Sequence, residues 1–436
     1  MPNNQKRVAF HTLGCKLNFS ETSTIARQFD ELGFERVSPN SQADVFVINT
    51  CSVTEHAEKK CRQAIKKFIK HSPNAFVAVV GCYAQLRPED LSNIEGVDLV
   101  MGASDRGNIP LYMGDASKNA KAKIYSCEID VLNDFFPAYS SGDRTRSFLK
   151  VQDGCDYHCT YCTIPNARGK SRNIPISTII TQAQSIASQG IKEIILTGVN
   201  TGDFGRTTGE SFIDLLKELE KVEGIERYRI SSIEPNLITD EVIAFVAASN
   251  KFLPHFHIPL QSGSNNILRL MKRRYNRELF ANKIEKIKQA IPNVFIGVDV
   301  IVGFPGETDN DFSDSYNLLN ELKPSFLHIF PYSERPGTPA SDFEGKVHPK
   351  AIKQRADKLQ HLSYLLHSEF YAQNIGRKEE VLFEGANRKG TITGFTRNYV
   401  KVEIDFRKEL AGKIASVQLL GTSNTGNLTA KIIKNE

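Results

Sequence analysis

The chain has 436 residues, of which 40% are hydrophobic and 24% charged, and its net charge is +5. This composition is typical of a globular protein with about three domains and excludes a disordered or fibrous chain. The longest apolar runs, such as residues 75–81, are much shorter than the ~18–20 residues of a membrane-spanning helix, and residues 1–10 lack the apolar region of a signal peptide. We therefore expect a cytoplasmic protein with no membrane association.

Residues 1–135 repeat one pattern, in which an apolar strand runs into a cysteine and a helical stretch follows. The three strands end at Cys15, Cys51 and Cys82. Short strands that alternate with helices predict a doubly wound α/β domain with a parallel sheet. Because the carboxyl ends of such strands border the ligand site, we expect the three cysteines to come together there. Three buried structural cysteines are the alternative.

After a connection at residues 119–146, a second βα series is expected within residues 141–374. Its predicted strands are residues 148–152, 193–198, 228–234, 255–261, 295–303 and 326–333. Six βα units are too few for a closed eight-unit barrel, so an incomplete (β/α)6 barrel with a wide mouth is expected, with its active site at the carboxyl ends of the strands. A helix at about 350–374, with apolar residues in one helical stripe, ends this domain.

Residues 376–436 are predicted to form a small β-barrel with strands at 399–406, 412–421 and 427–433. This segment holds 11 Lys and Arg against 7 Asp and Glu, an excess of four positive charges. A basic terminal module indicates a polyanionic partner, and a solvated basic surface is the alternative.

A compact cysteine motif, Cys155, Cys159 and Cys162, follows directly on the first strand of the expected barrel. Cysteines in a chain without a leader favour metal or redox chemistry over disulfides. A structural zinc ion needs four protein ligands, but His158 is confined between the thiols and the chain has no second CxxC pair. An iron–sulfur cube accepts three thiolates and leaves one iron open for another ligand.

The C-x3-C-x2-C spacing resembles that of the radical S-adenosylmethionine (SAM) superfamily. The resemblance implies that the open iron of a 4Fe-4S cluster chelates SAM, which is cleaved to a 5′-deoxyadenosyl radical. Tyr161 matches the family residue whose backbone approaches the adenine of SAM. Gly306 and its neighbours leave room for that adenine. This chain has Leu196-Thr197-Gly198 where many relatives have Gly-Gly-Glu. The other candidate cofactor-binding residues are Thr197, Gly198, Ser231, Ser232, Glu234 and Gly303.

With its N-terminal cysteine domain, the whole chain resembles the radical methylthiotransferases, which consist of an N-terminal domain (1–135 here), a radical SAM domain (141–374) and a TRAM RNA-binding domain (376–436). The motifs that carry the resemblance are "TLGCKLN" (12–18), "VINTCSVT" (47–54), "GCYAQ" (81–85), "CDYHCTYC" (155–162), "HIPLQSGS" (257–264), "MKRRY" (271–275) and "DVIVGFPGET" (299–308). The resemblance implies a second, auxiliary 4Fe-4S cluster at Cys15, Cys51 and Cys82, which holds the sulfur that one SAM methylates while another SAM yields the radical. Both clusters are expected to face one cavity.

Two further cysteines, Cys61 and Cys127, match no motif of this family, and we expect neither to be a ligand.

The motifs that contain Lys16 and Thr54 resemble those of the threonylcarbamoyladenosine (MtaB-type) branch of this family, although Leu17 stands where that branch usually has Val. The expected reaction is insertion of a methylthio group at C2 of N6-threonylcarbamoyladenosine, next to the anticodon of tRNA. The carboxylate of that substituent needs a cation, for which Lys16, Arg274 and Arg335 are the candidates. The same chemistry on N6-isopentenyladenosine or on a ribosomal-protein aspartate, and a non-catalytic RNA-binding zinc protein, are the alternatives.

The expected partners are the tRNA anticodon stem-loop and an electron donor, for which the family suggests a small flavoprotein. The sequence does not identify the sulfur donor, the oligomeric state or the order of the two SAM-dependent steps. The basic residues predicted to contact phosphate are Lys59, Arg62, Lys66, Lys70, Lys272, Arg273 and Arg274.

Overall fold

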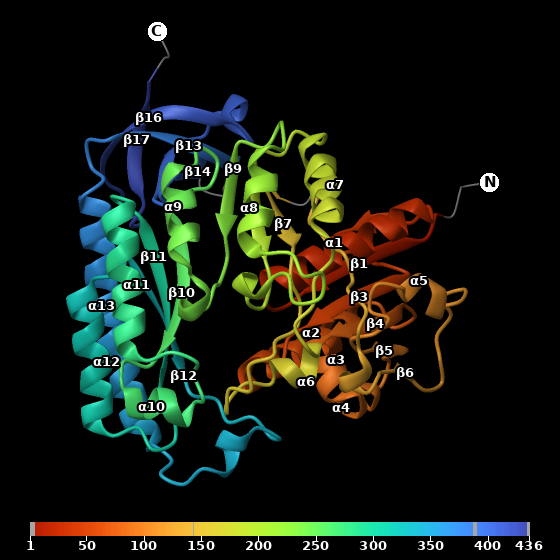
Figure 1. The fold of residues 1–436 in the computed structure, drawn as a ribbon. Helices are drawn as coiled ribbons and strands as arrows, with labels where there is room; N and C mark the ends of the chain where they lie inside the picture. The colour runs from red at the N-terminus through yellow and green to blue at the C-terminus, as the bar shows by residue number, and fades with distance from the viewer. Residues whose placement is uncertain (1–4, 143, 387–389, 434–436) are drawn as a thin grey trace.

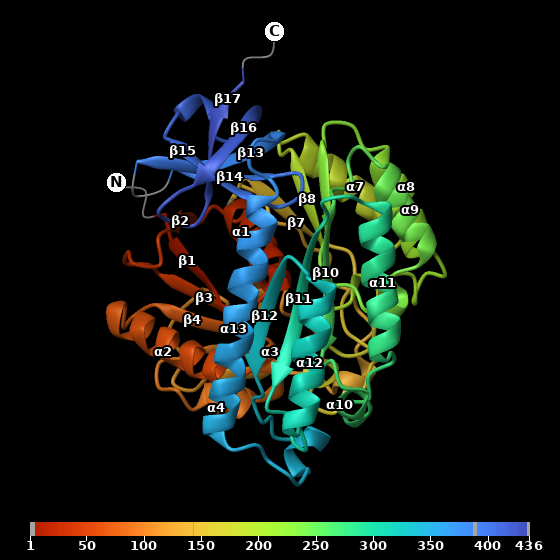
Figure 2. The same cartoon turned by 90° about the vertical axis from the view of Figure 1, so that its left-hand side faces the viewer.

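Three groups of strands organise the computed structural model, which describes residues 5–142, 144–386 and 390–433 (Figure 1). The first group forms a parallel sheet, the second an incomplete barrel and the third a small closed barrel. In Figure 2 the N-terminal sheet, in red and orange, lies beside the barrel strands, and the C-terminal barrel, in blue, lies over one end of them. The expected α/β fold class is thereby confirmed.

The N-terminal domain is a parallel sheet in the order β2-β1-β3-β4-β5-β6. Its strands are β1 Arg7–Thr12, β2 Glu35–Val37, β3 Val45–Thr50, β4 Phe76–Gly81, β5 Leu99–Met101 and β6 Lys123–Tyr125. Its helices are α1 Lys16–Glu31, α2 Glu55–His71, α3 Cys82–Leu86, α4 Pro88–Ser92 and α5 Ile109–Tyr112. Every residue of β3 and β4 is buried, as expected for central strands covered on both faces. The edge strand β6 lies within the stretch predicted as a connection, because three residues are too few to show a strand pattern.

The barrel consists of two three-stranded parallel sheets, β7-β8-β9 and β10-β11-β12. Isolated bridges, including one between Ser232 and His257, join them edge to edge. The strands are β7 Arg146–Lys150, β8 Glu193–Thr197, β9 Arg227–Ile230, β10 His255–Gln261, β11 Phe295–Val302 and β12 Phe326–Pro331. The helices are α6 Ile164–Arg168, α7 Ile176–Ala187, α8 Phe212–Glu220, α9 Asp240–Ala248, α10 Asn265–Leu270, α11 Arg277–Ala290, α12 Asp309–Leu322 and α13 Pro349–Ala372. The apolar faces of α7, α8, α9, α11, α12 and α13 share one core with the strands.

The C-terminal strands close into a barrel in the order β13-β14-β15-β17-β16. They are β13 Lys378–Ala386, β14 Thr391–Thr396, β15 Lys401–Asp405, β16 Ile414–Thr422 and β17 Leu428–Ile432. The strand predicted to begin at Tyr399 begins at Lys401 instead, since Tyr399 has a φ of +65° and lies in a turn. Short 3-10 helices occur at η1 Ile129–Val131, η2 Thr201–Asp203, η3 Pro235–Leu237, η4 Pro339–Asp342 and η5 Lys408–Leu410.

The C-terminal barrel packs on the amino ends of the central strands. The ring of Tyr399 lies 4.6 Å from that of His255 and 5.3 Å from that of Phe295. Arg229 donates to the carbonyl oxygens of Thr396 and Arg397 at 2.8 and 2.9 Å. The carboxyl ends of the strands therefore remain on the opposite side from this module. Over the described part of the chain, no helix combines the length and apolar character that crossing a membrane requires.

The N-terminal domain contacts the barrel through α1, which lies against β7. At this contact the Glu21 carboxylate is fully buried and pairs with Lys150 at 2.9 Å, Arg168 at 3.0 Å and Arg106 at 3.4 Å. Asp153, also fully buried, pairs with the same three cations. Buried charges are tolerated only when they are paired, so this network requires the two domains to meet in one orientation.

Candidate functional site

The first cysteine trio lies at the carboxyl ends of three neighbouring strands. Cys15 follows β1 and caps α1, Cys51 follows β3, and Cys82 follows β4 and begins α3. Because β3 pairs with both β1 and β4, the three cysteines lie at the same edge of the sheet, and their binding of one metal cluster stays a prediction. Burial, together with the neighbouring Cys82 and Cys15, raises the pKa of Cys51 to about 12. Such thiols ionise readily only when a metal compensates the charge.

Glycine allows the chain to turn sharply before two of these cysteines. Gly14 has a φ of +113° and Gly81 a φ of +102°, conformations that a residue with a side chain rarely adopts. A Cβ on Gly81 would lie 2.4 Å from Asn49 Oδ1, and a Cβ on Gly14 would lie 3.2 Å from Cys51 Sγ. Because these two glycines carry no side chain, the backbone just before Cys15 and Cys82 can pass close to its neighbours.

Cys61 supports the loop at Cys51. The Cys51 N–H donates to Cys61 Sγ, and the Cys61 S–H donates to the Cys51 carbonyl oxygen, both at 3.5 Å. Cys61 is fully buried in the apolar core of the sheet, and burial raises its pKa to about 11. Both hydrogen bonds give Cys61 a role in holding the loop. Cys127 is half-buried, and its carbonyl oxygen accepts a hydrogen bond from Gln85.

The second trio, Cys155, Cys159 and Cys162, lies in the loop between β7 and α6. Burial raises the pKa of Cys155 and of Cys162 to about 12. Cys159 Sγ accepts a hydrogen bond of 3.0 Å from Arg273, whose charge opposes the rise that burial causes in the Cys159 pKa. All eight cysteines are free. Two trios of clustered, unpaired thiols are the donor set that iron–sulfur clusters use.

Polar groups without partners lie at the carboxyl ends of β8 and β9. The buried Ser231 Oγ and Asn200 Nδ2 have no hydrogen-bond partner among the residues that the structure describes. A Cβ on Gly198 would lie 2.9 Å from Gln152 Oε1, so this position favours glycine. Buried polar groups of this kind normally have a partner, so these atoms fit a polar ligand such as SAM. The sequence analysis missed Asn200, which has no motif signal of its own.

Glu234 forms an ion pair with Arg273, the residue that also contacts Cys159. Burial raises the pKa of Glu234, and Arg273 opposes this rise. The hydroxyl of Tyr161 accepts a 3.4 Å hydrogen bond from the same guanidinium. Arg273 therefore connects the second trio to two candidate cofactor-binding residues.

The remaining cofactor candidates already have contacts within the protein. Thr197 Oγ1 donates to the Ile195 carbonyl oxygen at 3.2 Å, and the Ser232 carbonyl oxygen accepts from Thr201. Gly303 has a φ of +79°, and a Cβ there would lie 2.4 Å from Ile352 of α13. The packing against α13 by itself accounts for glycine at 303. A role of these residues in binding a cofactor stays a prediction.

Among the candidates for the substrate carboxylate, Arg335 is buried and pairs with Glu58 and with Ser52 Oγ, next to Cys51. Arg335 thus joins the barrel to the N-terminal domain, and its guanidinium is already paired with Glu58 and Ser52 of that domain. Arg274 is exposed and lies 3.9 Å over the ring of Tyr157.

The residues predicted to contact phosphate fall into two groups. Most of them are exposed, namely Lys59, Lys66, Lys70, Lys272 and Arg274. Arg62, by contrast, donates to the Tyr83 hydroxyl at 2.6 Å, and Arg273 is engaged at the second trio as described above.

Both trios border the same contact between the domains. Helix α3, which begins at Cys82, contacts α6, which follows Cys162. Arg168 of α6 donates to Asn18 Oδ1 at 2.8 Å, and Asn18 Oδ1 also accepts from Cys15 Sγ at 3.7 Å. One buried side chain thus connects the loop of the second trio with the first turn after Cys15.

Comparison with known proteins finds related sequences over nearly the whole chain. Residues 149–319 match the model of the radical SAM superfamily, and residues 7–102 match that of the uncharacterized protein family UPF0004. The chain is 43% identical to the threonylcarbamoyladenosine tRNA methylthiotransferase MtaB of Bacillus subtilis, over 95% of this chain and 93% of that protein. It is 32% identical to the tRNA-2-methylthio-N(6)-dimethylallyladenosine synthase of Acetivibrio thermocellus, over 99% and 92%.

A solved structure supports the fold alone. The radical SAM methyltransferase TsrM of Kitasatospora setae superposes with a TM-score of 0.57 at 13% identity, covering 77% of each chain.

Proposed function

The chain belongs to the MtaB family of tRNA methylthiotransferases, which are radical SAM enzymes, and we propose that it inserts a methylthio group at C2 of N6-threonylcarbamoyladenosine next to the anticodon. The observation that carries the proposal is the pair of free-thiol trios at strand carboxyl ends on the two sides of one domain contact. The lower identity to the dimethylallyladenosine synthase favours the threonylcarbamoyl substrate over the isopentenyl one. A non-catalytic zinc protein does not agree with membership of an enzyme family.

We assign the SAM-binding 4Fe-4S cluster to Cys155, Cys159 and Cys162, and an auxiliary 4Fe-4S cluster to Cys15, Cys51 and Cys82. When bound, these groups supply the radical that removes hydrogen from the base and the methylated sulfur that takes its place. The chemistry of the thiols supports the assignment, since burial raises the pKa of Cys155 and of Cys51 to about 12 and metal binding then displaces their protons.

The protein residues around the second trio have separate roles in this proposal. Arg273 places a positive charge against Cys159 and holds Glu234 by an ion pair. Ser231 and Asn200 offer their unpartnered polar atoms to SAM, and Gly198 lets it approach the backbone. On the other side of the domain contact, Cys61 fixes the loop of Cys51 without being a ligand.

We further infer that the exposed Lys59, Lys66, Lys70 and Lys272 and the basic C-terminal barrel contact tRNA phosphates. A tRNA substrate and a family of tRNA-modifying enzymes support a cytoplasmic location. A small flavoprotein is the electron donor that the family suggests.

Metal analysis tests the cluster assignment. The reconstituted wild-type chain should hold about eight iron and eight sulfide per chain, and replacing either trio by alanine should remove about four of each. Zinc without sulfide would contradict the assignment.

Mass analysis of tRNA nucleosides tests the substrate. Deleting the gene should remove 2-methylthio-N6-threonylcarbamoyladenosine and leave its unthiolated precursor. Loss of the 2-methylthio isopentenyl nucleoside instead would replace the proposed substrate by the isopentenyl one.

A further inference from the structure

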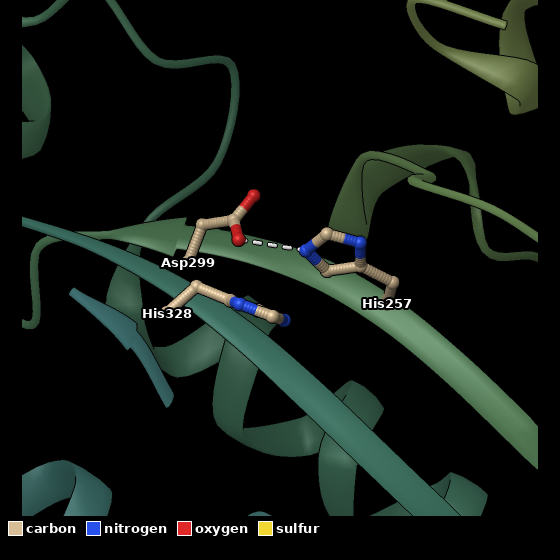
Figure 3. Close-up of side chains that lie close together, drawn as sticks. All are labelled: His257, Asp299 and His328. Atoms are coloured by element: carbon tan, nitrogen blue, oxygen red, sulfur yellow. Dashed lines mark hydrogen bonds and ion pairs between the residues drawn. The ribbon is translucent and has the colours of Figure 1, made fainter. Parts of the chain in front are cut away.

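Two imidazoles and a carboxylate gather on the inner face of the second barrel sheet (Figure 3). His257, Asp299 and His328 come from the neighbouring strands β10, β11 and β12, and their ligand atoms all lie within 4.8 Å of one another. Side chains alternate along a strand, so the register of the sheet places all three on one face. The residues next to them along each strand belong instead to the core that the helices cover.

The distances within this group suit ligands of one metal ion. His257 Nε2 and Asp299 Oδ1 lie 2.7 Å apart in a hydrogen bond, and the His257 ring centroid lies 5.0 Å from that of His328. A zinc ion in place of the shared proton would hold two such atoms about 3 Å apart, because Zn–N and Zn–O bonds are each about 2.0–2.2 Å long. Small side-chain rotations are therefore enough to turn the group into a three-ligand site.

The space between the two imidazoles is open. His257 and Asp299 are half-buried and His328 is exposed, although each lies within a strand of the barrel. A Cβ on Gly297, which pairs with His257, would lie 3.6 Å from His328 Nε2 and 3.9 Å from the His257 ring. Both rings thus lie over a residue that contributes no side chain, which is typical of a strand position where another group approaches closely.

The third ring is available as a ligand. Among the residues that the structure describes, none forms a hydrogen bond with the His328 side chain. Burial and the neighbouring His257 lower the pKa of His328, while Asp299 opposes this fall. Lys16, which is half-buried at the start of α1 and stays a candidate for the substrate carboxylate, adds a smaller lowering effect. His328 is therefore neutral at pH 7, and the neutral imidazole is the form that binds a metal.

Two imidazoles and one carboxylate are a recurring ligand set of divalent transition-metal ions, in zinc enzymes and in non-haem iron enzymes. Mg²⁺ and Ca²⁺ prefer oxygen ligands. We propose that His257, Asp299 and His328 bind a divalent transition-metal ion such as Zn²⁺, with at least one coordination position left for water or for an oxygen or nitrogen atom of a substrate. The inference goes beyond the proposed function, which uses none of these three residues.

A purely structural bond between His257 and Asp299 is the competing interpretation. Such a bond accounts for two of the three side chains. It does not account for the approach of a third ligand atom from the next strand, nor for the glycine over which the two rings lie.

Zinc binding by the holoenzyme, with both clusters reconstituted without oxygen, tests the proposal. Equilibrium dialysis against Zn²⁺ measures the zinc held per chain, and iron and sulfide are measured on the same samples. The wild type should hold one zinc ion more than His328→Leu, with a Kd of about 1 μM or tighter. His328→Leu should weaken this binding by about 100-fold or more, since losing an outer-shell partner alone costs about 10–100-fold. His328→Cys, which supplies another zinc ligand, should retain it.

Two further variants complete the test. His361→Leu is the matched control, because His361 is exposed on α13, and it should bind zinc as the wild type does. Asp299→Asn keeps the shape of the side chain but removes its charge, so it should weaken binding by about 10-fold or more. If His328→Leu does not fold or loses iron, Asp299→Asn decides.

Two results would overturn the inference. One is equal zinc binding by the wild type, His328→Leu and Asp299→Asn, because the zinc would then lie elsewhere, for example at unoccupied thiols. The other is a wild type that holds less than about half a zinc ion per chain at about 10 μM free Zn²⁺. A chain that binds zinc through these residues but does not methylthiolate tRNA would contradict the proposed function and leave the metal site standing.

Discussion

Replacing Glu21 by glutamine tests how the N-terminal domain is held on the barrel. Glu21 is fully buried in α1 and pairs with Lys150, Arg168 and Arg106. The substitution keeps the shape of the side chain and leaves three cations with Asp153 as their remaining carboxylate partner in the network. Breaking a buried ion network by removing one partner costs about 3–5 kcal/mol.

The pKa of Glu21 gives an independent magnitude. Burial raises this pKa, but Arg106, Arg168 and Lys150 outweigh burial and lower it from 4.5 to about 2. A carboxylate with a lowered pKa in the folded state contributes stability above its unfolded-state pKa and loses it as the pH falls through the folded-state value. The difference corresponds to about 3 kcal/mol at pH 7, and less than half of it remains at about pH 3. Since the group is fully buried, solvent screening does not reduce this figure.

Urea unfolding of the cluster-free, reduced protein provides the assay. Far-UV circular dichroism is the suitable signal, because the chain contains no tryptophan. At pH 7 the free energy of unfolding for the first transition should be lower in Glu21→Gln than in the wild type by about 3–5 kcal/mol. This difference should become smaller from about pH 4.5 toward pH 3. Glu31→Gln, at the exposed end of the same helix, is the matched control. A Glu21→Gln protein within about 1 kcal/mol of this control at pH 7, or a gap that stays constant down to pH 3, would refute the reasoning.

Further substitutions separate the roles assigned to other residues. Gly81→Ala introduces a Cβ 2.4 Å from a neighbouring side chain at a φ of +102°, so iron analysis should find about half of the wild-type content, whereas full iron would contradict the need for glycine. Cys61→Ala should keep all of its iron and unfold about 1–3 kcal/mol more easily, and a loss of about four irons would make this cysteine a ligand. Arg273→Gln should lower SAM binding at least 10-fold by equilibrium dialysis, while Arg274→Gln should not. Lys66→Ala should reduce the salt slope of tRNA binding by about 0.7–0.9, and an unchanged slope would remove it from the interface.

The sequence predicts the parts of the site that depend on local pattern. Cys15, Cys51 and Cys82 each end an apolar strand, and the topology of parallel sheets is enough to bring them together. The pairing of Arg335 with Glu58 joins residues 277 positions apart, so no local pattern could show that this arginine is engaged. Strand β6 was missed because three residues carry no periodicity.

The inner face of the barrel illustrates a different limit. His257 and Asp299 lie in motifs that the sequence displays, but a motif does not state which face of a strand a side chain occupies or what lies on the next strand. His328 shares their face only because β12 pairs with β11 in the register that sets His328 opposite Asp299. A shift of one residue would turn His328 to the other face. The polar group thus depends on tertiary register.

The domain contact uses buried charge where an apolar surface would bind as tightly. Replacing buried ion pairs by apolar side chains is often neutral or stabilising, so stability alone does not explain Glu21, Asp153 and Arg168 at this place. Apolar surfaces can slide over one another, whereas an ion network is satisfied in only one relative position of the two domains. Arg168 reaches Asn18 beside Cys15 and also lies in the helix that follows Cys162. A shift between the domains would therefore leave charges unpaired at the contact that the two thiol trios border, and we infer that the network sets the separation of the trios.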